Sequence, residues 1–175
     1  MTIGIIESAI VGIVSGLVSA IIFHCILKKS SPKIIISDEI EKREVNGKSE
    51  YRIKVVNLQK HFAVNVKPYL VLVHSQNGVN GLILRTKQLK VYEEDLPYID
   101  PFNKKDADCK YAVRFRVTEN LEVDWNNTVA QHLEIRIYCV DEFSGAGKLF
   151  VKNYYSPSCI VKGNFKTGKS LEIVQ

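Results

Sequence analysis

The chain has 175 residues, a formal net charge of +5, 46% hydrophobic residues and 25% charged residues, which are ordinary values for a folded protein. The charges are interspersed and mildly basic, which is compatible with an anionic lipid or a nucleotide partner but identifies neither. The four cysteines and four histidines are scattered without paired spacing, so we expect no zinc site, no other metal and no cofactor.

The N-terminal segment is the most informative part of the chain. From Ile3 to Leu27 the only charged residue is Glu7, and Lys28 and Lys29 end the apolar run. A helix of this span is longer than the ~30 Å hydrocarbon thickness of a bilayer. No Lys or Arg precedes the run, so it does not match a cleavable signal peptide. We therefore predict a transmembrane helix over residues 1–29 and a separate domain over residues 30–175.

The positive charges next to this segment predict its orientation. Lys28, Lys29 and Lys33 follow the segment, whereas no Lys or Arg precedes it. The positive-inside rule then places the N-terminus outside and the domain in the cytoplasm, with the chain crossing the inner (plasma) membrane once. An extracytoplasmic adhesion or envelope domain is the alternative.

Small residues recur at every fourth position of the apolar segment, and residues four apart lie on one face of a helix. This small-residue stripe consists of Gly4, Ser8, Gly12, Gly16 and Ala20. Small residues allow the close backbone approach on which helix association in lipid depends, so we predict a homo-oligomer within the bilayer. The alternative is that Gly and Ala are simply frequent in membrane helices.

Two ionisable residues lie near the ends of the apolar segment. In an oligomer, Glu7 at one mouth and His24 at the other would line a pore. Ionisable groups inside membrane spans are costly and usually functional. Alternatively, Glu7 is close enough to the N-terminus to reach the water of the headgroup region.

After a linker at Ser30-Ser31-Pro32, alternating apolar and polar residues predict strands, and turn residues separate most of them. We count about eight or nine strands and no soluble helix, which predicts an antiparallel β-sandwich or barrel. In particular, one face of the strand at 110–118 should carry Tyr111, Val113, Phe115 and Val117. The inward face of the strand at 132–141 should carry Leu133, Ile135, Ile137 and Cys139. The predicted strands are 33–44, 51–56, 66–74, 82–92, 110–118, 132–141, 148–155, 159–163 and 171–174.

No motif requires catalysis. The glycine-rich sequence Ser144-Gly145-Ala146-Gly147-Lys148 lacks the spacing of a phosphate-binding loop and is not followed by a helix. It is better explained as a hairpin turn with Asp141 and Glu142 as caps. No serine lies in a nucleophile elbow. We therefore predict no catalytic residues and a protein that is not an enzyme.

One basic surface is a candidate ligand-binding site. Arginines alternate outward on the strand predicted at 110–118, and an arginine and a tyrosine do so on the strand at 132–141. If these strands pair, the side chains form one patch that suits phosphates and bases. Alternatively, Glu134 neutralises its neighbours and the face is only solvated. The patch would consist of Arg114, Arg116, Arg136 and Tyr138, and Arg52 and Lys54 form a weaker basic edge.

The small-residue stripe from Gly4 to Ala20, the Lys28-Lys29 stop and the strand-rich remainder together resemble bacterial anti-phage membrane effectors. Proteins of this class carry N-terminal membrane helices before a small cytoplasmic β-rich domain. The better-known members with a β-barrel have two helices, whereas this chain has one. The resemblance implies that the β domain senses a nucleotide or oligonucleotide second messenger or an upstream sensor protein. The helices would then assemble and breach the inner membrane.

A second function fits the same sequence. A membrane-tethered β-sandwich without toxicity could serve as a binding or scaffold module for another protein. The span would then act only as an anchor, and an unrelated span could replace it.

Overall fold

The computed structural model describes residues 2–79, 81–125 and 130–175, apart from the side chains of residues 2, 3, 5–7 and 9. It confirms a mainly β chain with one N-terminal apolar helix, since 50% of the residues are in strands and 18% in helices. The described residues form 12 strands rather than eight or nine, because several are very short.

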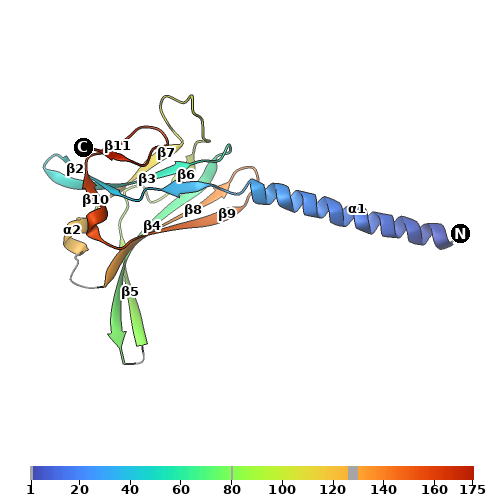
Figure 1. Cartoon of the computed structure of the whole chain (residues 1–175), viewed down its shortest axis with the longest axis horizontal. Coiled ribbons are helices and arrows are strands. Elements are labelled where there is room, and N and C mark those ends of the chain that lie inside the picture. Colours follow the sequence, from blue (N-terminus) through green and yellow to red (C-terminus); the bar gives the residue numbers. More distant parts are fainter. Residues whose placement is uncertain (1, 80, 126–129) are drawn as a thin grey trace.

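The N-terminal helix α1 (Thr2–Lys29) extends away from the β domain as a rod (Figure 1). Its segment Ile10–Lys29 has a mean hydropathy of 2.5, and none of it is buried, so the helix is long and apolar enough to cross a membrane. The helix ends where the amide of Ser30 donates to the carbonyl oxygen of Ile26, and Pro32 then prevents its continuation.

The first sheet, sheet A, is built around a central strand, β3 (Lys48–Asn57). On one side β3 pairs antiparallel with β7, and on the other side it pairs antiparallel with β1 and β2. Strand β10 runs parallel to β2 at the edge. These partners of β3 are β1 (Ile34–Ile36), β2 (Ile40–Val45), β7 (Ala112–Val117) and β10 (Ile160–Lys162).

The second sheet, sheet B, is built around β4 (Ala63–Gly78), which pairs with β8 on one side and with β5 and β6 on the other. Strand β9 extends the sheet beyond β8. The far part of β4 and nearly all of β5 leave the sandwich as a two-stranded arm (Figure 1). The other strands of sheet B are β5 (Gly81–Leu89), β6 (Leu96–Ile99), β8 (Gln131–Asp141) and β9 (Gly147–Tyr154).

Small elements complete the domain and correct two expectations. The predicted strand 33–44 is broken at Ser37, whose buried hydroxyl donates to the carbonyl oxygen of Glu39 and accepts from the amide of Lys54. The expectation of no helix in the domain was wrong, because Asn120 caps the single turn α2. The small elements are α2 (Leu121–Asp124), η1 (Pro157–Cys159), β11 (Asn164–Phe165) and β12 (Ile173–Val174).

The core lies between the two sheets. The alternation predicted for β7 and β8 is confirmed, since Phe115 and Ile135 are completely buried and their neighbours along the chain are less buried. These side chains join one hydrophobic cluster with Ile53 and Val55 of β3 and Leu70 of β4. Two sheets that bury their inner faces against each other in this way form a β-sandwich.

Two glycines with positive φ offer a test of how the C-terminal strands are held. Gly47 (φ +73°) lies in open space, whereas a Cβ at Gly163 (φ +151°) would lie 2.4 Å from the carbonyl oxygen of Val174. We expect Gly47→Ala to cost about 1 kcal/mol of unfolding free energy, from backbone strain alone. We expect Gly163→Ala to cost more and to detach β12 from β11. Urea denaturation and hydrogen exchange of residues 164–174 measure both effects. Equal losses of unfolding free energy in the two variants would contradict the close contact between Gly163 and Val174.

Candidate functional site

The predicted basic patch does not form. Strand β7 pairs with β3 in sheet A, whereas β8 pairs with β4 and β9 in sheet B. The expected pairing of the two strands was therefore wrong, and Arg114 and Arg116 lie on a different sheet from Arg136 and Tyr138. An alternating pattern identifies the buried face of a strand, but it does not identify the neighbouring strand.

Two of the three arginines have acidic partners of their own. The Nε of Arg116 donates to Glu93 at 2.7 Å, and its guanidinium carbon lies 3.9 Å from the centroid of the Tyr92 ring. Arg136 forms an ion pair with Glu134, as the alternative interpretation expected. These charges are therefore already partly satisfied within the chain.

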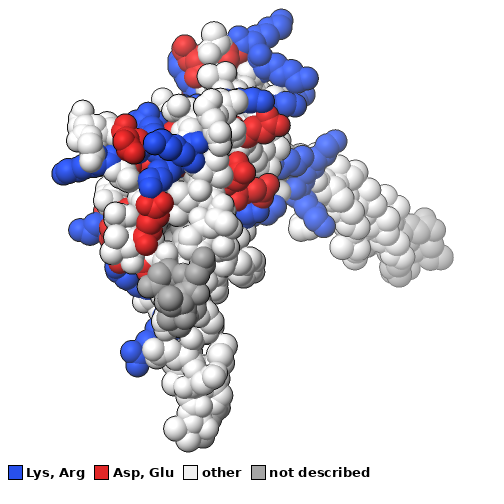
Figure 2. Space-filling model, turned by 60° about the vertical axis from the view of Figure 1, so that its left-hand side comes forward, with Lys and Arg blue, Asp and Glu red and all other residues white. Residues whose placement is uncertain are grey.

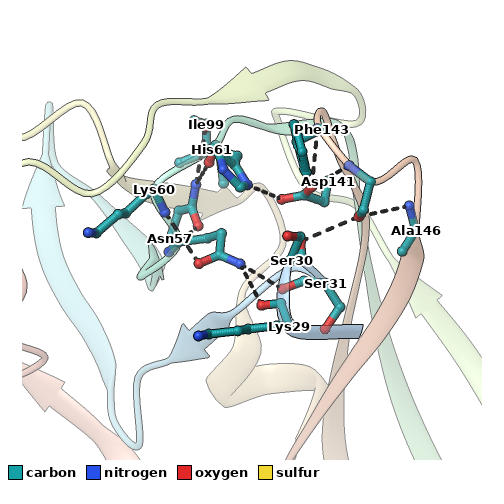
Figure 3. Close-up of polar contacts among 12 residues, drawn as sticks. Lys29, Ser30, Ser31, Asn57, Lys60, His61, Ile99, Asp141, Phe143 and Ala146 are labelled. Atoms are coloured by element: carbon teal, nitrogen blue, oxygen red, sulfur yellow. Dashed lines mark hydrogen bonds and ion pairs between the residues drawn. The ribbon is translucent and has the colours of Figure 1, made fainter. Parts of the chain in front are cut away.

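Helix α1 is tied to the domain by side chains from two loops (Figure 3). The Nε2 atom of Gln59 donates to the carbonyl oxygens of Lys29 and Ser31, at 3.3 and 3.2 Å. The hydroxyl of Ser144 donates to the carbonyl oxygen of Ser30 at 3.4 Å. Because the last carbonyl oxygens of a helix receive no hydrogen bond within the helix, Gln59 and Ser144 supply donors to carbonyl oxygens at its end.

The loop that carries Ser144 is held by a buried carboxylate (Figure 3). Asp141 is 1% exposed, and its Oδ1 accepts from the amides of Phe143 and Ser144 at 3.1 and 2.8 Å. Its Oδ2 lies 3.3 Å from the Nδ1 of His61, whose ring centroid is 5.1 Å from that of Phe143. The predicted hairpin turn and its Asp141 cap are therefore confirmed, whereas the amide of Glu142, the second predicted cap, donates to the carbonyl oxygen of Phe62.

The loop that carries Gln59 is held by Asn57, the last residue of β3. The Nδ2 of Asn57 donates to the carbonyl oxygens of His61 and Asp100, at 2.9 and 3.0 Å, and its Oδ1 accepts from the amide of Gln59 at 2.9 Å. The two loops thus form one connected polar network around the end of α1. We call this network the helix junction, and it consists of Asn57, Gln59, His61, Asp141 and Ser144.

The small-residue stripe faces no other part of the described chain. A Cβ at Gly4, Gly12 or Gly16 would meet nothing within 4 Å, and Ser8 and Ala20 are exposed. The Ser8 hydroxyl donates to the carbonyl oxygen of Gly4 at 2.8 Å. The whole face is therefore available to another helix.

The two predicted pore-lining residues are described to different extents. His24 is exposed and borders an open groove of about 510 Å³ between the end of α1 and the turn at Ser144–Ala146. The side chain of Glu7 lies outside the described part of the chain.

The structure also places a basic site that the sequence did not indicate. Lys54 was expected on an exposed edge, yet it is 1% exposed, and its Nζ donates to the carbonyl oxygens of Lys166 and Ser170 at 2.6 and 2.8 Å. It is directly opposite Arg114 across the β3–β7 ladder. The only sequence signal was the apolar character of β3, in which Ile53–Asn57 are all buried.

Burial and, to a smaller extent, the charge of Arg114 together lower the pKa of Lys54 to about 8, against weaker opposing effects of Cys109 and Glu41. Burial disfavours the charged ammonium, and a neighbouring cation does the same. As for metal ligands, the described residues contain no group of three or more His, Cys, Asp or Glu side chains.

The helix junction predicts the effect of removing its carboxylate. Asp141→Ala leaves two amides and His61 without their acceptor, so we expect a loss of about 1–3 kcal/mol of unfolding free energy. The exposed Asp38, which pairs with Lys152, is the control, and Asp38→Ala should cost less than about 1 kcal/mol. Urea denaturation followed by the fluorescence of Trp125 measures both. Equal losses would show that the network does not hold the turn.

The lowered pKa of Lys54 predicts a pH dependence. Between pH 8 and pH 10.5 the unfolded chain binds a proton at Lys54 that the folded chain has lost, so stability should rise with pH in this range. The rise is at most about 1.4 kcal/mol per pH unit. Lys54→Met lacks this proton, so the stability of the wild type should increase relative to the variant from pH 8 to pH 10.5. Denaturation of both full-length proteins in detergent tests this, and parallel pH curves would contradict it.

Comparison with known proteins assigns no family. No protein-family model and no curated protein sequence matches the chain. Among solved structures, the chain is similar to the crystal structure of Spo0M, a sporulation control protein from Bacillus subtilis. The TM-score is 0.39 with 11% sequence identity, and the match covers 71% of this chain and 49% of that chain. The chain thus spans about half the length of that protein.

Proposed function

We propose that this chain is a single-span membrane effector. Its α1 helices associate through the small-residue stripe and permeabilise the inner membrane when the cytoplasmic β-sandwich senses a ligand or partner, in anti-phage defence. The observation that carries the proposal is the exposure of α1, whose segment Ile10–Lys29 is not covered by any part of its own domain.

The exposed side chains of α1 need an apolar environment. Ten large apolar residues of the helix are between 48% and 67% exposed. At ~25 cal/mol per Å² of apolar surface, leaving this helix in water is very unfavourable. A helix satisfies its own backbone hydrogen bonds, so a bilayer can take it up without unpaired polar groups.

Positive charges mark one end of this helix. Lys28 and Lys29 lie in its last turn, and Figure 2 shows basic side chains where the white part of the rod meets the domain. Basic residues beside a span are retained on the cytoplasmic side. This supports a cytoplasmic domain and an external N-terminus.

The helix junction supplies a route from sensing to permeabilisation. Gln59 and Ser144 contact the backbone at Lys29–Ser31, and both belong to loops held by buried polar side chains. A ligand that favours another arrangement of the domain would therefore shift the end of α1 as well. Around the axis of an oligomer, Glu7 and His24 would then lie at the two mouths of the leak.

A second function, a membrane-tethered scaffold, is favoured by a different observation. Sheet B carries exposed apolar side chains on its outer face, and the β4–β5 arm has an uncharged end in Figure 2. Exposed apolar surface of this kind often binds a partner protein. The residues are Tyr69, Tyr138, Leu149 and Val151 on the sheet and Val79, Leu82, Ile83 and Leu84 on the arm.

Substitutions in the small-residue stripe test the effector proposal. Gly12→Leu and Gly16→Leu should each reduce dye entry and loss of membrane potential in expressing cells by about tenfold or more, because the added bulk prevents close helix contact at a cost on the order of 1–3 kcal/mol. Val14→Leu, on the opposite face, is the matched control and should stay active. Undiminished permeabilisation by both glycine variants, at equal amounts in the membrane, would refute the proposal.

Exchange of α1 distinguishes the two functions. A chimera with an unrelated single span should be inactive if α1 forms the leak, and fully active if the span is only an anchor. Retained function in the chimera would therefore favour the scaffold.

A further inference from the structure

Two cations lie side by side in sheet A without an acidic partner. Lys54 of β3 and Arg114 of β7 are directly opposite each other. Lys54 donates to two carbonyl oxygens, and Nη2 of Arg114 donates to the carbonyl oxygen of Phe165 at 3.3 Å. Among the described residues, no carboxylate forms an ion pair with either cation, and the buried Nε of Arg114 has no acceptor.

This arrangement is unfavourable for the free protein. Like charges opposite each other on neighbouring strands repel, and buried charges are normally paired. Two carboxylates in this part of the domain have other partners. Glu41 accepts from the amide of Phe165 at 3.0 Å, and the exposed Asp108 lies 3.6 Å from Lys110. The site thus has an excess of positive charge that an anion from solution would offset.

A small cavity lies beside these charges. Its volume is about 70 Å³, and Lys54, Arg114, Cys109 and Gly168 are among the residues that line it. This is enough for several water molecules, or for one small oxyanion in their place. Gly168 (φ +73°) packs closely at this cavity, since a Cβ at this position would lie 3.4 Å from the hydroxyl of Tyr111 and 3.9 Å from the sulfur of Cys109.

We propose that this cavity binds a phosphoryl group, from free phosphate or a nucleotide, through the charges of Lys54 and Arg114. Such groups suit paired cations because they carry several acceptor oxygens and a full negative charge. A phosphoryl group would then be the part of the ligand that the β-sandwich senses. The link from phosphoryl binding to permeabilisation of the membrane rests on the proposed function, whereas the binding itself is measured without reference to α1.

The cavity is positioned to influence the rest of the chain. The segment that covers it contributes the carbonyl oxygens of Lys166 and Ser170 to Lys54, so an anion there changes how firmly this segment is held. Lys54 also lies three residues before Asn57 on the same strand, and Asn57 is part of the helix junction. Strand β3 thus connects the cavity with the end of α1.

Thermal unfolding of the full-length protein in detergent tests the binding. The probes are inorganic phosphate, AMP and adenosine, each at the same ionic strength. We expect saturating phosphate or AMP to raise the unfolding temperature by several degrees, and adenosine to have no effect. A shift with AMP alone identifies a phosphate ester as the source, and a shift with phosphate alone identifies the free ion.

Variants separate specific binding from the general stabilisation that phosphate gives to proteins. Lys54→Met and Arg114→Met should lose the shift, whereas Arg136→Met, on the other sheet, should keep it. Equal shifts in all four proteins, or equal shifts with AMP and adenosine, would overturn the proposal.

Alkylation of Cys109 gives a second readout of binding, and it does not require the Lys54→Met and Arg114→Met variants to fold. In a Cys25→Ser, Cys159→Ser background, Cys139 is buried and Cys109 is the half-buried thiol that lines the cavity. The bound anion should slow its reaction with a maleimide several-fold. An unchanged rate at saturating phosphate and AMP, together with unshifted unfolding temperatures, would refute the site.

Discussion

Strand β3 is covered on both faces, and this burial constrains the rest of the domain. Its inner face packs against sheet B, where Ile53 and Val55 join the common core. Its outer face lies under the C-terminal segment at residues 166–170, in which the carbonyl oxygens of Lys166 and Ser170 accept hydrogen bonds from Lys54. A strand buried in this way has little freedom to shift, so the residues along it are placed accurately relative to both sheets.

The same burial has an electrostatic consequence. Lys54 is removed from water beside Arg114, and its pKa falls to about 8 because burial disfavours the ammonium. Strongly perturbed groups in small cavities are typical of functional sites, although structural charges are perturbed as well. Here the perturbation coincides with a cavity and with a guanidinium nitrogen that lacks an acceptor.

The proposed function requires that the domain and the helix communicate, and their connection is short and polar. Asn57 ends β3 and holds the loop of Gln59, while Asp141 holds the turn of Ser144. Both loops contact the backbone where α1 ends. Hydrogen bonds of this kind have directional geometry, so the helix end follows the loops more closely than it would follow a flexible linker.

The sequence by itself determined the local features. The apolar run predicted α1, the alternation in 111–117 and 133–139 predicted two strands with their buried faces, and the glycine-rich sequence at 144–148 predicted the turn between β8 and β9. Only the tertiary structure decided which strands are neighbours. It placed β7 beside β3, separated the predicted basic patch, and buried Lys54 beneath the C-terminal segment. Alternation and turn chemistry are properties of adjacent residues, whereas strand pairing and burial arise from contacts between segments far apart in the chain.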